Sequence, residues 1–188
     1  TTNSNGLATF SGLYQDNYKL TEISTNDNYV INKATFDVNV EYNQTNTQTI
    51  TNEHKKGNIK VYKIDKDNKK VVLGNVEFKL YSEEFKKIIG TYYTDVNGEL
   101  EIKNLRTGNY KLIETKTNKW YNLANDTEIK VEWDKETTKN IENELKKGQV
   151  KVIKIDKDNN EVKLEGVEFE VLDENDKVLE KIITDENG

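Results

Sequence analysis

Segments of this sequence recur at an interval of about ninety residues, and no other feature restricts the possible folds as strongly. The run VYKIDKDN at 61–68 returns as VIKIDKDN at 152–159, and VEFKLY at 76–81 returns as VEFEVL at 167–172. A repeat of this length is one structural unit copied along the chain. Each copy is therefore predicted to adopt the same fold.

A second pair of matches links the first third of the chain to its middle. NYKLTE at 17–22 matches NYKLIE at 109–114, and ITNEHKKG at 50–57 matches IENELKKG at 141–148. These matches are offset by 92 and 91 residues, and 91 residues also separate position 63 from position 154. The repeat unit is therefore about 91 residues long.

The matches also predict how the chain is divided. We expect residues 1–57 to be the C-terminal part of one repeat, 58–148 a complete repeat, and 149–188 the N-terminal part of a further repeat. The chain contains no methionine, so we expect it to be part of a longer translation product. The joints HKKGN and LKKGQ are too short to be flexible linkers, which predicts that neighbouring units follow one another closely.

The residue pattern within a unit is typical of β-structure. Short runs rich in Val, Ile, Tyr, Phe and Thr alternate with polar residues, and turn clusters such as DKDN, DVNG and TGN separate them. Strands at this spacing predict an all-β sandwich. The only helix candidate is SEEFKKI at 82–88, where a hairpin fits the pattern equally well.

Composition argues against several functional classes. The formal net charge is −6 and the pI is near 5.1, and no basic stripe is present to neutralise the phosphates of a nucleic acid. No apolar run has membrane-spanning length, and no cysteine is available for disulfides or thiolate metal sites. We find no Ser, His and Asp set and no phosphate loop, so we expect neither a cofactor nor a turnover enzyme.

The DKDN clusters at 65–68 and 156–159 invite comparison with calcium loops. They lack the glycine and the downstream glutamate of an EF-hand. Asp and Asn tolerate unusual backbone angles, so these clusters are predicted to be hairpin turns, and no metal site is expected.

Three polar residues stand at positions where the strand pattern favours apolar ones. Alternate residues of a strand share one face of the sheet. Counting by two along each strand groups Lys63 with Ile59 and Val61, Glu114 with Tyr110 and Leu112, and Asn143 with Ile141 and Leu145. The partial repeats carry counterparts at matching positions, which are Glu22 and Asn52 in residues 1–57 and Lys154 in residues 149–188.

A lysine and a glutamate inside an apolar core favour their neutral forms, because burial penalises charge. A neutral amine is a nucleophile, and a protonated carboxyl can polarise an amide. If the first strand of the unit lies beside the last, Lys63 can attack the side-chain amide of Asn143, release ammonia and form an isopeptide bond, with Glu114 as proton shuttle. Folding holds such reactants at a high effective concentration.

The motifs VYKID, GVEF or NVEF, TDxNG, YKLIET, and IENE followed by KKG resemble the Cna B-type (SpaA-like) domain of Gram-positive surface proteins and pilins. The resemblance implies a transthyretin-like, inverse-immunoglobulin β-sandwich in each unit. It also implies a spontaneous bond between Lys63 and Asn143, assisted by Glu114. Family members usually continue the glutamate motif with Ala-Pro and Gly-Tyr, whereas this chain has ETKTNKWY at 114–121 and contains no proline.

From this resemblance we expect a structural stalk repeat of an extracellular protein, such as an adhesin or a pilus-like fibre, on the cell surface or anchored to the cell wall. The only catalysis expected is the single-turnover formation of the cross-link. An alternative is an adhesive binding module whose loops hold a host protein or a glycan. A third possibility is that copies join head to tail, with Lys154 of one chain linked to Asn52 of the next, although a window on a longer array would explain the same ends.

Overall fold

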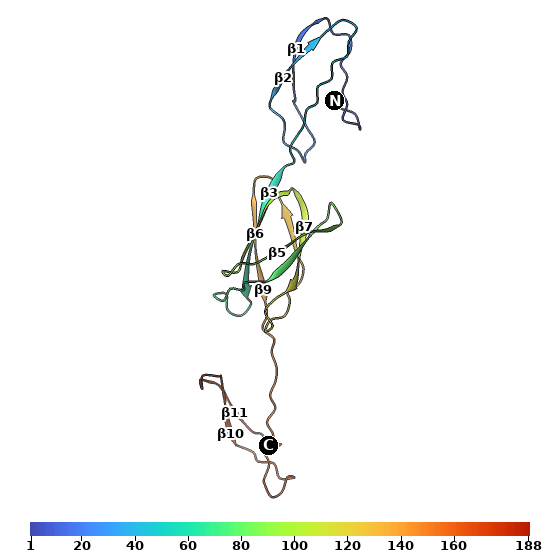
Figure 1. Ribbon diagram of the computed structural model, residues 1–188. Helices are drawn as coiled ribbons and strands as arrows, with labels where there is room; N and C mark the ends of the chain where they lie inside the picture. Colours follow the sequence, from blue (N-terminus) through green and yellow to red (C-terminus); the bar gives the residue numbers. More distant parts are fainter. The chain divides into compact units, whose positions relative to one another are not determined.

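The computed structural model describes residues 1–188 and consists of β-strands joined by turns and extended segments (Figure 1). The all-β fold predicted from the sequence is confirmed. No α-helix is present that is long and apolar enough to cross a membrane. The chain divides into two compact units, Thr1–Lys146 and Lys147–Gly188.

Two sheets form a sandwich within the first unit. The three-stranded sheet has the order β6–β3–β9, with β3 at Lys56–Asp65, β6 at Glu99–Arg106 and β9 at Glu136–Asn143. The four-stranded sheet has the order β5–β4–β7–β8, with β4 at Glu77–Ser82, β5 at Lys87–Tyr93, β7 at Gly108–Lys116 and β8 at Thr127–Val131. Neighbouring strands are antiparallel except β3 and β9, which run parallel.

Side chains from both sheets fill the space between them, because alternate residues of each strand point inward. Burial alternates along the whole of β3, from Gly57 to Asp65. The buried hydrophobic residues are Ile59, Val61, Leu73, Val76, Phe78, Leu80, Leu100, Ile102, Tyr110, Leu112, Tyr121, Ile129, Val131 and Ile141. Full burial of each large aliphatic or aromatic side chain contributes roughly 1.5–3 kcal/mol, so this cluster is the main noncovalent source of stability.

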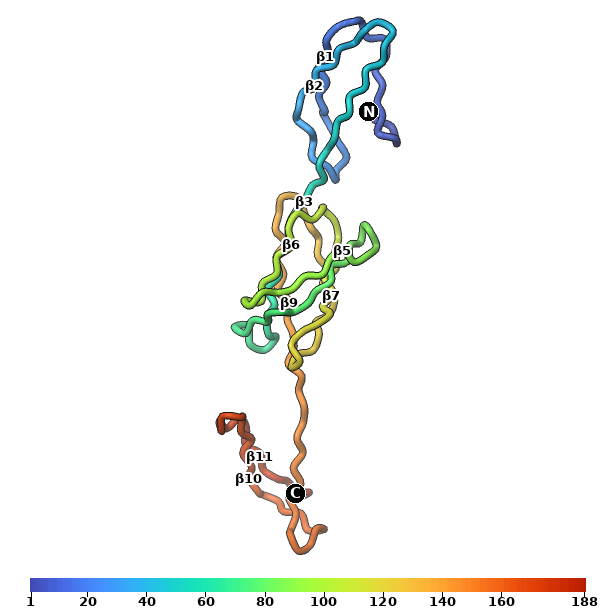
Figure 2. The backbone as a smooth tube through the Cα atoms, in the orientation of Figure 1, coloured from blue at the N-terminus to red at the C-terminus, as the bar shows by residue number.

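Residues 82–88 belong to a hairpin and not to a helix. Ser82 at the end of β4 pairs with Lys87 at the start of β5. Lys86 takes a left-handed φ of 52°, which lets the chain reverse direction. The hairpin is the green loop that projects from the sandwich in Figure 2. Pairing of β4 with β5 on one side and β7 on the other decides between the two alternatives that the sequence left open.

The DVNG turn before β6 holds β3 in place at the level of Lys63. Gly98 in this turn has a φ of 73°, in the left-handed region that glycine enters without strain. Its carbonyl oxygen accepts the backbone N–H of Lys63 at 2.7 Å. A Cβ at position 98 would lie 2.6 Å from the Lys63 carbonyl oxygen, so only glycine allows this turn to approach the strand so closely.

Residues 1–55 form a smaller β-structure in the same unit. The strands β1 (Asp16–Thr21) and β2 (Thr35–Val40) pair in an antiparallel ladder. Tyr29 and His54 form an isolated antiparallel bridge, and their ring centroids are 4.2 Å apart. This bridge ties the segment that precedes β3 to the loop that follows β1.

The second unit is a hairpin with an extended segment before it. The strands β10 (Glu168–Leu172) and β11 (Val178–Ile183) pair antiparallel, with an irregularity in register between Val171 and Leu172. Residues 149–156 match β3 in sequence and are largely extended, with Ile155 bridged to Lys163. The counterparts of the buried β3 residues are therefore more open here, and Val150 is 89% exposed.

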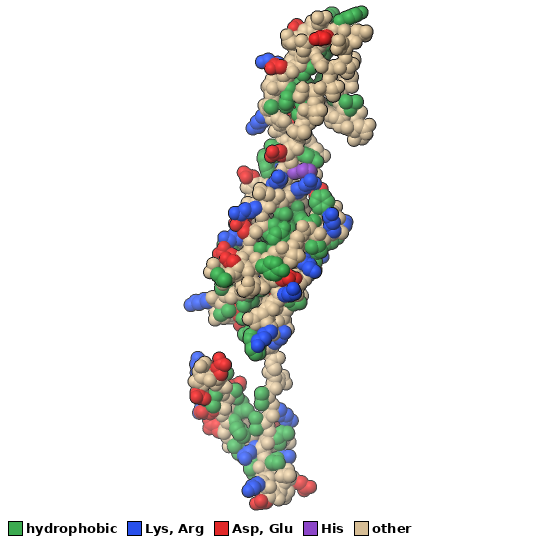
Figure 3. Space-filling model, viewed as in Figure 1, with side chains coloured by type: hydrophobic (Ala, Val, Ile, Leu, Met, Phe, Trp, Pro, Cys, Tyr) green, Lys and Arg blue, Asp and Glu red, His purple; other side chains and the backbone are tan.

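Acidic and basic side chains are interspersed over the face shown in Figure 3. Several form ion pairs at the surface, such as Lys69 with Glu142 at 2.6 Å. Exposed pairs of this kind contribute about 0.2–1 kcal/mol each. These charges therefore favour solubility more than they stabilise the fold.

Candidate functional site

Lys63, Glu114 and Asn143, called the triad below, lie on three strands and meet in the interior of the sandwich. In the parallel pairing of β3 with β9, Lys63 is opposite Ile141, and Asp65 is opposite Asn143. Lys63 and Asn143 are therefore diagonal neighbours on one face of the sheet. Glu114 lies on β7 in the other sheet and faces them across the core.

The triad is held together by direct polar contacts. The Lys63 Nζ donates a hydrogen bond to Asn143 Oδ1 and a second to the Ile141 carbonyl oxygen at 3.2 Å. The same Nζ lies 3.4 Å from Glu114 Oε2. Asn143 Nδ2 donates to Glu114 Oε1 at 2.6 Å. Each of the three residues thus contacts the other two.

The triad is shielded from water. The exposed fraction is 0% for Lys63, 5% for Glu114 and 1% for Asn143. Burial lowers the pKa of the Lys63 amine below its usual value, and the Glu114 carboxylate opposes this shift. The lowered pKa makes the neutral, nucleophilic form of the amine more accessible than it is for a lysine in water.

Glu114 spans the two groups that would react. Its Oε2 faces the Lys63 amine, and its Oε1 accepts from the amide nitrogen of Asn143. The backbone N–H of Ala124 donates to Oε2 at 3.2 Å and fixes the orientation of the carboxyl group. One carboxyl group therefore lies within reach of both the amine that must lose a proton and the amide nitrogen that must gain one.

Two contributors to the site were not predicted from the sequence. The Thr117 hydroxyl accepts a hydrogen bond from Asn143 Nδ2 at 2.9 Å, and the Ala124 N–H orients Glu114. A backbone donor leaves no trace in the residue pattern. Thr117 carries a usable signal, because it follows Glu114 by three residues, as Thr25 follows Glu22 in the first repeat.

Glu22 and Asn52 form a similar contact within residues 1–57. Asn52 Nδ2 donates to both carboxylate oxygens of Glu22, at 2.8 and 2.7 Å. The backbone N–H of Asn32 donates to Glu22 at 2.8 Å, as Ala124 does to Glu114. The Asn32 N–H is the largest cause that holds the pKa of Glu22 below its ordinary value. The structure therefore brings this predicted pair together as well.

Lys154 is exposed in the second unit. Its backbone environment repeats that of Lys63, since its N–H donates to the carbonyl oxygen of Gly188 just as Lys63 donates to Gly98. The glutamate and asparagine motifs of the repeat do not occur in residues 149–188. The part played by Lys154 stays a prediction.

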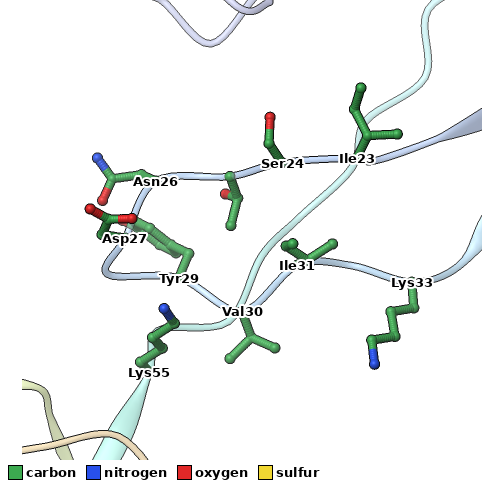
Figure 4. Close-up of a pocket in the computed structure, with 10 residues that line it drawn as sticks. Ile23, Ser24, Asn26, Asp27, Tyr29, Val30, Ile31, Lys33 and Lys55 are labelled. Carbon is green, nitrogen blue, oxygen red and sulfur yellow. The ribbon is translucent and has the colours of Figure 1, made fainter.

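A shallow pocket lies beside the loop that follows Glu22 (Figure 4). The side chains of Ile23 and Ser24 extend away from those of Val30 and Lys33, so the lining groups do not converge on one point. No group of His, Asp and Glu side chains in residues 1–188 is arranged to hold a metal ion. The polar groups that do converge are those of the triad.

The sandwich with its buried triad was compared with known families and structures. A family model described as SpaA, prealbumin-like fold domain, matches residues 1–54, 57–145 and 148–188. No sequence among curated proteins matches the chain. The TIE protein of Bacillus anthracis aligns with 99% of this chain and 36% of its own, at 23% identity and a TM-score of 0.73.

Two pilins also align. GBS52, the minor pilin of Streptococcus agalactiae, aligns with 80% of this chain and 69% of its own, at 24% identity and a TM-score of 0.47. BcpA, the major pilin subunit of Bacillus cereus, aligns with 50% of this chain and 31% of its own, at 26% identity and a TM-score of 0.43.

The two packed sheets and their core define a prealbumin-like β-sandwich. The chain belongs to the SpaA family of prealbumin-like fold domains, because the family model matches nearly its whole length. The transthyretin-like fold and the family resemblance predicted from the sequence are thereby confirmed. The likeness to the TIE protein shows a shared fold, and this chain spans about a third of that protein.

Glu77 contacts the end of β7 that carries Glu114. Its carboxylate accepts hydrogen bonds from the hydroxyls of Thr115 and Tyr93, at 2.7 and 2.9 Å, and pairs with Lys116 at 3.0 Å. These groups come from β5 and β7, so one buried side chain of β4 connects three strands. The Thr115 hydrogen bond, followed by those of Lys116 and Tyr93, lowers the pKa of Glu77 from 4.5 to about 2.

The Glu77 network predicts a loss of stability in acid. A carboxyl whose folded pKa is lower than its unfolded pKa stabilises the native state above the unfolded value, and this contribution disappears as the pH falls through the folded value. For Glu77 the window runs from 4.5 down to about 2. We expect Glu77→Gln to lower the melting temperature at pH 7 and to match the wild type near pH 2, in thermal unfolding at a series of pH values.

Glu99→Gln, at an exposed ion pair with Lys60, is the control and should show a small effect throughout. A constant difference between wild type and Glu77→Gln across this window would contradict the assignment.

Proposed function

We propose that this chain is a structural stalk repeat of a cell-surface or fibre protein, stabilised by an isopeptide bond between Lys63 and Asn143. The observation that carries the proposal is the buried triad, which connects the first and last strands of one repeat. A lysine and a glutamate without solvent are costly in a core, and their presence together with a reactive amide favours a chemical role. The extracellular location in this proposal follows from the family to which the chain belongs.

The cross-linking step balances within the triad. The Lys63 ammonium first transfers a proton to Glu114, which leaves a neutral amine and a neutral carboxyl. The amine nitrogen then bonds to Cγ of Asn143 and loses a second proton. The bond between Cγ and Nδ2 breaks, Nδ2 takes the proton held by Glu114 and departs as ammonia, and Glu114 takes up the second amine proton and ends as a neutral carboxyl. The products are one secondary amide and one ammonia, and no cofactor enters the balance.

The fold lowers the activation barrier of this step. Residues 63 and 143 are 80 positions apart in the sequence but lie in hydrogen-bond contact on adjacent strands. Holding reactants in such a geometry removes most of the entropic barrier to their meeting. Exclusion of water also prevents hydrolysis of the amide from competing with attack by the amine.

The bond would change how the unit carries force. The chain enters the sandwich through β3 and leaves it through β9, which run parallel and are paired along their length. Tension applied to the two ends would reach Lys63 along β3 and then pass directly to Asn143. The residues between these two positions would not be loaded, which suits a repeat that spaces a distant part of a protein from the cell wall.

We also propose that separate copies can join head to tail through Lys154 and Asn52. The supporting observation is that Glu22 and Asn52 already hold each other as Glu114 and Asn143 do. A strand from another copy with the sequence of 150–156 would bring Lys154 to this pair.

The intact mass of the chain under denaturing conditions tests the cross-link. We expect the wild type to be lighter than its sequence by one ammonia, and Glu114→Gln to have its full mass, because the proton shuttle is lost. Glu77→Gln is a matched control, since it alters a buried glutamate outside the triad, and it should lose ammonia like the wild type. Tryptic digestion should leave a branched peptide that joins Lys63 to Asn143. A wild-type chain of full mass would refute the proposed bond.

Single-molecule stretching tests the force path. In the wild type we expect no release of the segment between Lys63 and Asn143 at any force that leaves covalent bonds intact. In Glu114→Gln, unfolding should release the chain between these two positions, which are 80 apart in the sequence, and add about 280 Å at 3.5 Å per residue. Equal released lengths for the two chains would rule out a cross-link that carries the applied force.

Denaturing gels of the purified chain over a range of concentrations test head-to-tail joining. We expect covalent ladders that grow with concentration in the wild type. Either Lys154→Arg or Asn52→Ala should abolish them, whereas Lys151→Arg should not. Their absence from the wild type at high concentration would exclude this mode of assembly while leaving the cross-link within the middle repeat unaffected.

A further inference from the structure

Thr117 is the side chain outside the triad that contacts the Asn143 carboxamide. It is in the loop after β7, three residues beyond Glu114, and is half-buried, whereas the triad is fully buried. Its hydroxyl oxygen is 2.9 Å from Asn143 Nδ2. It therefore joins the Asn143 amide nitrogen to the loop after β7.

The hydrogen bonds of the Asn143 carboxamide are completely assigned. Its oxygen accepts from Lys63, one N–H donates to Glu114, and the other N–H donates to Thr117. A carboxamide has one acceptor group and two donor hydrogens, so each has a partner. The reversed orientation would set the amide oxygen against the Glu114 carboxylate and the NH₂ group against the Lys63 amine, whereas the Thr117 hydroxyl can bond to either end of the amide. The orientation observed is thus the favoured one.

The first repeat uses a different acceptor for the asparagine nitrogen. There Asn52 Nδ2 donates to both oxygens of Glu22 and to the backbone carbonyl oxygen of Val30 at 2.9 Å. In the complete repeat, Asn143 Nδ2 donates to Glu114 Oε1 and to the Thr117 hydroxyl, and Glu114 Oε2 faces the Lys63 amine. The Thr117 hydroxyl thus stands where a backbone carbonyl acts in the first repeat.

We propose that Thr117 is a positioning residue for isopeptide formation, which holds the second amide hydrogen of Asn143 so that the carboxamide presents its carbonyl group to Lys63 and its nitrogen to Glu114. This inference rests on the proposed function, because it assigns a part in that reaction. The bond to Thr117 adds a third contact to those of Lys63 and Glu114 and further restricts rotation about the bond between Cβ and Cγ. As the bond to Nδ2 breaks, the Thr117 hydroxyl remains the acceptor for an N–H of the departing ammonia.

The rate of cross-linking tests this part for Thr117. The full chain would be made by cell-free translation, samples would be quenched in denaturant, and the fraction lacking one ammonia would be followed by intact mass. We expect Thr117→Val to slow the reaction about tenfold, which is the rate effect of one orienting hydrogen bond. Thr117→Ser keeps the hydroxyl and should react at nearly the wild-type rate.

Thr115→Val is the matched control, because the Thr115 hydroxyl bonds to Glu77 and not to the triad. It should cross-link at the wild-type rate even where it lowers stability. Circular dichroism of each variant separates a folding defect from slow chemistry, and if Thr117→Val does not fold, Thr117→Ala carries the same test. Equal rates for folded wild type and the variant without the hydroxyl would overturn the inference and leave the cross-link standing. A wild type that loses no ammonia would overturn both.

Discussion

The parallel pairing of β3 with β9 is the contact on which the site depends. These strands are the first and last of the complete sandwich, and their register sets Lys63 diagonally across from Asn143 on the inner face. Parallel neighbours need a long connection between them, and here that connection contains the other five strands of the domain. Lys63 and Asn143 are therefore brought together by strand pairing across 80 positions of the sequence.

The triad would exchange noncovalent stability for the proposed cross-linking chemistry. A buried ion pair is often no more stabilising than apolar side chains of the same size, because desolvation offsets the attraction between the charges. Here the charges have extra partners, since the Ile141 carbonyl oxygen and the Ala124 N–H complete the hydrogen bonding around Lys63 and Glu114. No buried side-chain polar atom is left without a hydrogen bond, so the core accommodates these groups while it keeps the amine next to the amide.

The sequence predicted the fold and the triad because both depend on alternation. A strand with one buried face shows its inward residues at every second position, so the polar exceptions at positions 63, 114 and 143 could be recognised. The same count failed at Leu145, which is 39% exposed because β9 ends at Asn143. It also gave no hint that Glu77, between two inward residues, would be covered by side chains from neighbouring strands. Loop contacts such as that of Thr117 depend on chain geometry and have no periodic pattern.

The register of β3 and β9 has a further meaning for an assembly of many such domains. A slip of one residue would turn the Lys63 side chain to the outer face of the sheet, and a slip of two would move it by about 6.6 Å along the strand. Neither misaligned form could make the bond to Asn143. The covalent link would thus form only in a domain whose first and last strands are correctly paired, and it would form separately in each domain. A chain that carries the link in every repeat would have the correct register throughout before tension acts on it.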